Sequence, residues 1–335
     1  MDTHRNYSID SLRTIATLLV ICIHVYAPFF KEFSSNNLGV DFWIANGIDS
    51  FSRFSVPVFV MISGYFLIGR NEPLQLFFNN RAKKIIVPII FWTLFYSFYT
   101  HLGSIVKFGT IDFSAVAIAI VEGKPYYHLW YVYMLLGLYA SVPFLNLMIK
   151  TVSIDRTKQI IIFLFIIGLI NTTYEFLFEI NSFFVLWFIN YLGYFLLGYY
   201  VKKSVSSISN SKLIFIFLMA SMLIVFLTYL TFQVWGSLYF YLYLSPFVIL
   251  ASIAVFKLFT QIEIKKNWLS NFSEYSFGVY LIHAFILHVL LTFGKKYNPH
   301  FFEPKFGLLV VLLVFCLSVM CVKVIHQIPY LKKIV

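Results

Sequence analysis

Charged residues are scarce in this sequence. Only 12% of the 335 residues are Asp, Glu, Lys or Arg, and 60% are hydrophobic, whereas about a quarter of a soluble domain is usually charged. No long polar stretch interrupts the apolar runs. These deficits argue against a soluble globular protein, and the length suits one membrane domain with no soluble appendage. We therefore expect any chemistry to lie in membrane-spanning helices and their short connections.

Cysteine is also rare. Cys22, Cys316 and Cys321 all lie in apolar runs, at spacings that suit neither a metal site nor a redox motif. We therefore expect no metal centre, and we interpret the thiols as small buried side chains. No small-residue cleavage site precedes or follows the first apolar run, which predicts a retained helix and not a signal peptide.

Apolar runs of about twenty residues, the length that crosses a bilayer as a helix, fill most of the chain. They predict an all-α, polytopic integral membrane bundle that forms a single domain over residues 1–335. The shorter run 111–121 is expected to lie at the membrane interface. The expected spans lie near residues 10–30, 44–68, 85–107, 128–149, 159–178, 183–201, 212–232, 238–259, 272–293 and 306–328.

The distribution of Lys and Arg gives a second test, because cytoplasmic loops of membrane proteins are enriched in both. With the N-terminus inside, sixteen of these residues fall in inner segments and six in outer segments. The asymmetry predicts that both termini are cytoplasmic. It also explains the net charge of +11 as topology, so no nucleic-acid partner is expected.

The first span carries three ionisable residues, which are costly in the hydrocarbon region unless they face a bundle interior or a wet cavity. Asp10 and Arg13 share a helix face near the inner end. His24 lies eleven residues beyond Arg13, on nearly the same face and about 16 Å deeper. The alternative is that Arg13 reaches the headgroups and His24 is a packing residue. The shared face favours an enzyme or a transporter.

The second span places Arg53 one turn after Asp49, at a spacing that suits an ion pair. Pro57 and Ser63 follow on the same span, where Pro57 frees a backbone carbonyl. A kinked, tightly packed helix with an internal ion pair is the alternative to a functional role.

A basic cluster, Arg81, Lys83 and Lys84, precedes the third span. It suits either anionic lipid at the inner surface or a phosphorylated cytosolic ligand, because Arg and Lys are the usual partners of phosphate.

The fourth span opens at the outer interface with His128, Trp130 and Tyr131. Aromatic belts account for the Trp and Tyr residues, whereas His128 adds a group that suits a polar substrate.

The ninth span carries Tyr280 and His283, with His283 near the depth of His24. Two histidines at one depth on different helices suit a shared cavity. Glu175 and Glu179, between the fifth and sixth spans, are expected to be solvated loop carboxylates, with contact to a sugar acceptor as the alternative.

Four segments occur in a fixed order: Asp10-Ser-Leu-Arg13 with His24, Ser55-Val-Pro57 through Ser63-Gly64-Tyr65, His128-Leu-Trp130-Tyr131, and Tyr275 through Tyr280-Leu-Ile-His283. Together they resemble the integral membrane acyltransferase family 3. Within it, the chain is similar to short stand-alone members that acylate surface polysaccharides, such as the enterobacterial common antigen O-acetyltransferase and the intercellular adhesin modification protein. The resemblance covers about residues 7–290. It departs at the basic pair before the third span, where the family often shows two arginines and this chain has Lys84 as the second residue.

The resemblance implies an O-acyltransferase of the bacterial plasma membrane. Such an enzyme moves an acyl group, usually acetyl from acetyl-coenzyme A, to a hydroxyl of an extracytoplasmic polysaccharide or lipid-linked sugar, and it needs no metal. The resemblance also implies that His24 is catalytic and that Arg13 lines the donor path. The partners are then the sugar acceptor and membrane lipid, and a second copy of the chain stays an open alternative.

On this interpretation the site residues fall into three groups. Arg13, Arg81, Lys83 and Lys84 bind coenzyme A; His24, Arg13, Arg53, Ser63, Tyr280 and His283 form the catalytic set; and His128, Trp130 and Tyr131 contact the acceptor. Direct transfer and a transient acyl-histidine both stay open. The rival interpretation is a transporter of a polysaccharide or lipid-linked sugar.

Overall fold

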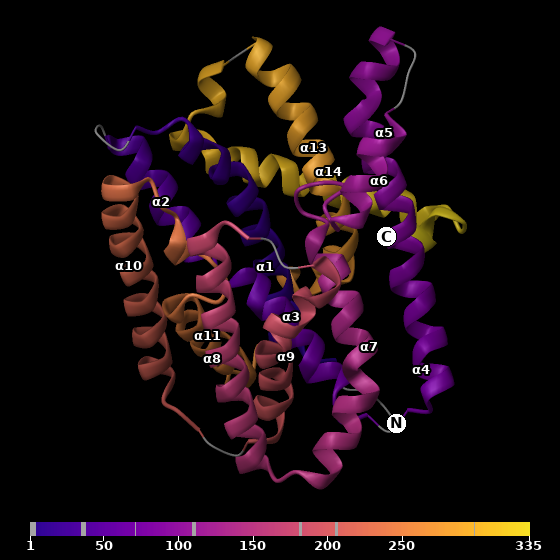
Figure 1. Cartoon of the computed structure of the whole chain (residues 1–335), viewed down its shortest axis with the longest axis vertical. Helices are drawn as coiled ribbons and strands as arrows, with labels where there is room; N and C mark the ends of the chain where they lie inside the picture. The colour runs from indigo at the N-terminus through magenta and orange to yellow at the C-terminus, as the bar shows by residue number, and fades with distance from the viewer. Residues whose placement is uncertain are drawn as a thin grey trace.

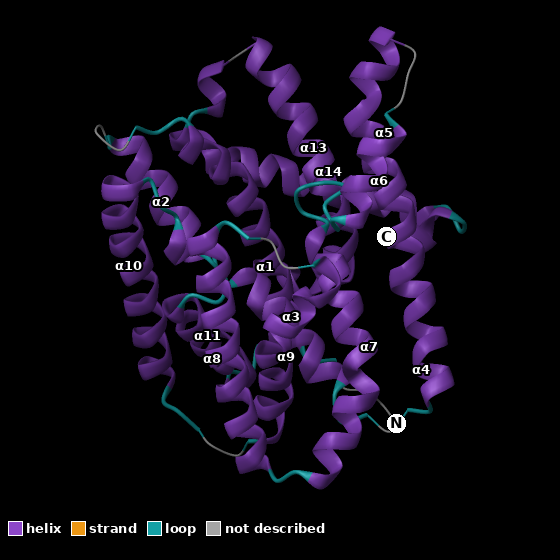
Figure 2. Ribbon diagram, viewed as in Figure 1, coloured by secondary structure: helices purple, strands orange, loops and turns teal. Residues whose placement is uncertain are grey.

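The computed structural model describes residues 5–34, 38–70, 72–108, 112–180, 183–204, 207–297 and 299–335. These ranges contain helices and connections and no β-strand (Figures 1 and 2). Ten helical stretches within them are long and apolar enough to cross a membrane, which confirms the predicted all-α polytopic bundle. The α-helices are α1 Tyr7–Tyr26, α2 Val40–Ser52, α3 Ser55–Leu67, α4 Leu74–Arg81, α5 Val87–Phe108, α6 Phe113–Val121, α7 Trp130–Thr151, α8 Ile154–Phe178, α9 Trp187–Lys203, α10 Asn210–Trp235, α11 Pro246–Gln261, α12 Trp268–Phe272, α13 Ser276–Tyr297 and α14 Gly307–Gln327.

The second span, for which the sequence allows a kink at Pro57, is divided into two helices. It consists of α2 and α3, separated by a turn at Arg53 and Phe54. The cause is Pro57, whose ring would clash with the carbonyl of Arg53 in an unbroken helix and which donates no hydrogen bond. Placed in the first turn of α3, Pro57 is tolerated.

The third span begins earlier than the sequence predicts. The segment around the basic cluster is helical: α4 continues through a π-helical turn, Ala82–Ile86, into α5. No glycine or proline lies between Leu74 and Val87 to end the helix, and the wider π turn accommodates Pro88 at the start of α5. Arg81 and Lys84 therefore project from a helix and not from a loop.

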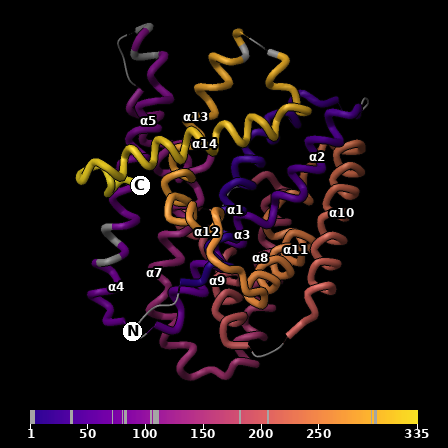
Figure 3. The backbone as a smooth tube through the Cα atoms, turned by 180° about the vertical axis from the view of Figure 1, so that it is seen from behind, coloured from indigo at the N-terminus to yellow at the C-terminus, as the bar shows by residue number. Residues whose placement is uncertain are grey.

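Helix α1 lies in the centre of the bundle (Figure 1). It contacts α2, α3, α11, α12, α13 and α14. Behind it, α14 runs obliquely across the bundle and brings the C-terminus to α5 (Figure 3), where the Trp92 indole donates to the Ile334 carbonyl at 2.7 Å. By contrast, α8 is at the periphery and exposes Phe163, Ile166 and Ile170, as expected for a helix that faces lipid.

Glycines bring α3 and α9 into backbone contact. A Cβ on Gly64 would lie 1.8 Å from the Phe195 carbonyl oxygen, and a Cβ on Gly198 would lie 2.0 Å from that of Met61. Small residues allow such close approach between membrane helices. We call this reciprocal contact the glycine seam.

Candidate active site

Three histidine rings meet in the middle of the bundle, brought there by α1, α13 and the residues just before α7. His24 Nδ1 lies 2.8 Å from His283 Nε2. The His128 ring centroid lies 5.2 Å from that of His283 and 6.3 Å from that of His24. His283 and His128 are 0% and 1% exposed, whereas His24 is only partly buried. Of these three imidazoles, His24 alone is partly exposed.

A cavity of about 410 Å³ opens toward the N-terminal end of α1; we call it the inner cavity. It collects the side chains of Arg13, Arg81 and Lys84, together with the carboxylate of Glu274. Arg81 also pairs with Glu72 at 3.2 Å. The sequence predicted that these basic residues act together, and the structure places them around one cavity. The side chain of Lys83, the fourth predicted member, lies outside the described residues.

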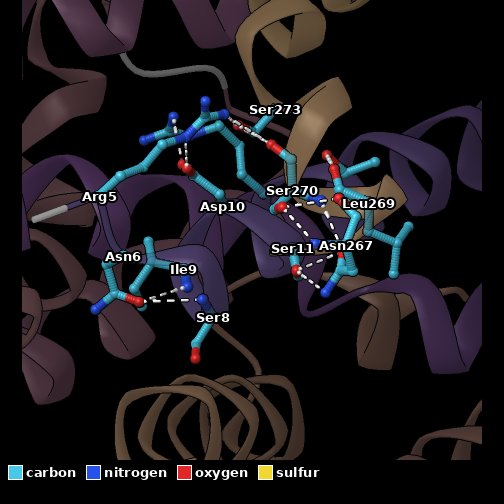
Figure 4. A network of polar contacts seen from close by, with 12 residues as sticks. Arg5, Asn6, Ser8, Ile9, Asp10, Ser11, Asn267, Leu269, Ser270 and Ser273 are labelled. Atoms are coloured by element: carbon cyan, nitrogen blue, oxygen red, sulfur yellow. Dashed lines mark hydrogen bonds and ion pairs between the residues drawn. The ribbon is translucent and has the colours of Figure 1, made fainter. Parts of the chain in front are cut away.

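Arg13 is positioned by a polar network at the start of α1. Asp10 lies 3.5 Å from Arg13 through one carboxylate oxygen and 2.6 Å from Arg5 Nε through the other. The hydrogen bond that Arg5 donates to Asp10 raises the pKa of the Arg5 guanidinium. Figure 4 shows Arg5 continuing this network to α12, where it donates to the Ser270 carbonyl at 2.8 Å and to Ser273 Oγ at 3.2 Å. The network ties the cationic end of α1 to α12.

A second cavity, of about 450 Å³, lies at the opposite end of the histidine cluster; we call it the outer cavity. Its walls are largely aromatic, with Trp130 stacked on Tyr243 at a centroid distance of 5.8 Å. The polar side chains in the walls are Lys124, Thr172, Glu175 and Asn190. Aromatic faces combined with a few amide, hydroxyl and charged groups suit a polyhydroxylated ligand.

The two cavities approach the histidines through one aromatic residue each. Tyr127 lines the outer cavity and meets His24 edge-on at 5.0 Å. Tyr280 lines the inner cavity, lies 5.8 Å from His283, and donates its hydroxyl to the His128 carbonyl. The histidines themselves line neither cavity, and each cavity is separated from the cluster by one of these aromatic side chains.

The remaining predicted residues divide between these places. Ser63 lines the inner cavity. His128, Trp130 and Tyr131, expected on one substrate surface, are separated: Trp130 faces the outer cavity, Tyr131 faces the inner cavity, and His128 joins the histidine cluster. Residues 130 and 131 point in different directions because neighbours on a helix are about 100° apart.

Arg53 lines neither cavity. It pairs with the buried Asp49 at 2.6 Å, as its spacing predicted, donates to the Tyr241 carbonyl at 3.3 Å and covers the Tyr241 ring at 4.2 Å. These contacts tie the turn between α2 and α3 to Tyr241.

Sequence reasoning missed much of the outer cavity. Glu175, expected in solvent, is partly buried and accepts a hydrogen bond from Asn171 at 3.0 Å, whereas Glu179 is exposed as expected. Asn190 also lines this cavity and is not among the residues that the sequence predicted. Both asparagines are polar residues within apolar runs, which is the signal that could have identified them.

A family model described as "Acyltransferase domain" matches residues 6–326. A protein named as an amino-acid racemase from Enterococcus faecalis is 32% identical over 140 residues, which are 38% of this chain and 18% of that protein. The nodulation protein NolL of Sinorhizobium fredii is 25% identical over 183 residues, 52% of this chain and 47% of that protein. The chain thus spans less than half the length of either relative. No solved structure matches it.

Proposed function

Since this chain belongs to the acyltransferase-domain family and is a multi-pass membrane protein, we propose that it carries an acetyl group from acetyl-coenzyme A to a sugar hydroxyl. The donor enters from the cytoplasm, and the acceptor is a polysaccharide or lipid-linked sugar outside a bacterial plasma membrane. Family membership favours this enzyme over the transporter that the sequence left as a rival. The narrower likeness to the common-antigen and adhesin enzymes stays a prediction.

The inner cavity suits the donor. Coenzyme A is anionic through its phosphates, and Arg13, Arg81 and Lys84 supply three cations around one opening. The cavity volume of about 410 Å³ is within the range of small-molecule sites. It suits the pantetheine arm and the acetyl group, with the phosphates at the mouth. The N-terminal end of α1 lies at the same end of the bundle as the basic α7–α8 turn (Figure 1), which supports cytoplasmic entry.

The outer cavity suits the acceptor. Apolar ring faces of a sugar pack on Trp130 and Tyr243, and its hydroxyls have Glu175 and Asn190 as hydrogen-bonding partners. Tyr127 joins this cavity to His24, so a bound hydroxyl has a short route to the imidazole.

His24 is the proposed general base. It takes the proton from the sugar hydroxyl as the hydroxyl oxygen attacks the thioester carbonyl carbon. The carbon–sulfur bond then breaks, and the leaving thiolate of coenzyme A takes the proton back from the imidazolium. An ester and free coenzyme A result, and His24 returns to its neutral form. The observation that carries the proposal is the partly buried His24, which lies one aromatic side chain, Tyr127, from the aromatic cavity and pairs with His283, which lies one aromatic side chain, Tyr280, from the cationic cavity.

The test is His24→Ala beside the control His326→Ala, which removes a histidine that lies outside the histidine cluster, against the Tyr275 ring. Purified protein in vesicles is supplied with acetyl-coenzyme A and a sugar acceptor, and both thiol release and ester formation are measured. His24→Ala should lower kcat about 10²- to 10⁴-fold, and His326→Ala should keep the parental rate. Equal rates in the two folded variants would remove His24 from the reaction.

A further inference from the structure

The hydrogen bonds of His283 determine which of its nitrogens carries a proton. Its Nδ1 lies 2.7 Å from the Tyr280 carbonyl oxygen and 3.2 Å from that of Val279, one turn earlier on α13. A carbonyl oxygen only accepts hydrogen bonds. His283 Nδ1 must therefore be an N–H group that donates to its own helix.

The position of the proton on His283 determines the position of the proton on His24. A neutral imidazole carries one N–H, so His283 Nε2 has a lone pair and accepts. The atom that faces it at 2.8 Å is His24 Nδ1, which must then be the donor. The lone pair of His24 is left on Nε2.

We infer that His283 is a positioning residue, which uses the backbone carbonyls of α13 to fix the tautomer of His24 and so presents Nε2 as the base. The inference rests on the proposed function, in which His24 accepts the hydroxyl proton. Among the described residues, no carboxylate hydrogen-bonds to either imidazole. A neutral histidine here holds the place that a carboxylate holds in a Ser-His-Asp triad.

The surroundings of His283 fix its ring. The side chain is 0% exposed, its ring stacks on that of His24 at 4.9 Å, and the His128 ring meets it nearly at right angles. Tyr280, whose carbonyl accepts from Nδ1, is itself anchored through its hydroxyl to the His128 backbone. Ring rotation would break these contacts together.

Two amide substitutions separate the role of the His283 acceptor from that of its bulk. The side-chain amide of Gln reaches the position of imidazole Nε2, whereas that of Asn reaches only the position of Nδ1. His283→Gln should therefore keep an acceptor for His24 and keep kcat within about tenfold of the parent. His283→Asn should lower kcat about 10²-fold, with the KM for acetyl-coenzyme A unchanged. Equal kcat values in the two variants would overturn the inference.

The tautomer is measured directly on the resting protein. In ¹⁵N spectra of histidine-labelled protein, the His24 signals are identified by their loss in His24→Gln. We expect a protonated Nδ1 and a bare Nε2 in the parent and in His283→Gln, and a mixture of tautomers in His283→Asn. A protonated Nε2 in the parent would overturn the inference, whatever the activity. Full activity of His24→Ala would instead overturn the proposed function and leave the spectrum to decide the tautomer.

Discussion

Removing one cation from the inner cavity should weaken the use of the donor without changing the chemical step. Arg13 is the residue of choice because its partner contact is long, 3.5 Å to Asp10, and its side chain is 30% exposed, so Arg13→Gln leaves no deeply buried charge unpaired. Asp10 keeps its shorter contact with Arg5, at 2.6 Å.

The expected magnitude follows from the contact that is lost. A hydrogen bond to a charged group contributes about 1.5–3 kcal/mol, and partial exposure places Arg13 at the lower end of that range. About 1.4 kcal/mol corresponds to a tenfold change, so Arg13→Gln should raise the KM for acetyl-coenzyme A about tenfold. Arg13→Glu should be worse, because it sets a second carboxylate beside Asp10 and repels the phosphates.

The assay is thiol release from acetyl-coenzyme A at varied donor concentration, with Lys203→Gln as the matched control. Lys203 ends α9, carries the same charge, and lines neither cavity. A general loss of surface potential would affect both variants alike, and more so at low salt. The reasoning is refuted if Arg13→Gln lowers kcat with no change in the donor KM, or if Lys203→Gln raises that KM equally.

Three other outcomes are expected. Trp130→Ala should raise the KM for the sugar acceptor severalfold through loss of ring stacking, while thiol release without acceptor is unchanged. The control is Trp268→Ala, which removes an exposed Trp side chain. An unchanged acceptor KM in Trp130→Ala would remove Trp130 from the acceptor site. Gly198→Ala should destabilise the protein by about 1–3 kcal/mol or more, which is measured as a lower melting temperature in detergent. The control Gly47→Ala should keep the parental melting temperature, because a Cβ on Gly47 has no neighbouring atom within 4 Å. Equal melting temperatures in the two variants would contradict the close contact at Gly198. In a variant lacking Cys22, Cys316 and Cys321, an impermeant thiol reagent on intact cells should label Gln233→Cys at the outer end of α10 and spare Asp155→Cys at the start of α8; the reverse pattern would invert the proposed orientation.

The sequence predicted the span count and the face of α1 because both depend on local periodicity. Arg13 and His24 belong to one helix, so their relation needed only the helical repeat. The kink at Pro57 was foreseen, but the division into two helices and the early start of the third span were not, because they depend on a steric clash and on a tolerated π turn at the element boundaries.

The place of His128 depends on tertiary packing. The turn before α7 brings His128 between α1 and α13, where its ring is 1% exposed. Hydropathy places a residue at the start of an apolar run near the interface, and it contains no information about a connection that folds inward. The outer cavity is assembled from residues as distant in sequence as Lys124 and Tyr243, so it too could not be predicted from local pattern.

The glycine seam limits the relative movement of α3 and α9. Helix α3 contributes Ser63 to the inner cavity and α9 contributes Asn190 and Tyr191 to the outer cavity, and the seam leaves these two helices no room to slide. One helix that lines each cavity is therefore held against the other, whereas the halves of a transporter rock relative to each other. A membrane potential acts on each elementary charge with about 2.3 kcal/mol per 100 mV, so a contact that limits relative movement of these two helices also limits the opening of a path for ions. On the proposed assignment, only a neutral two-carbon fragment passes the histidines, and on that fragment the potential does no work.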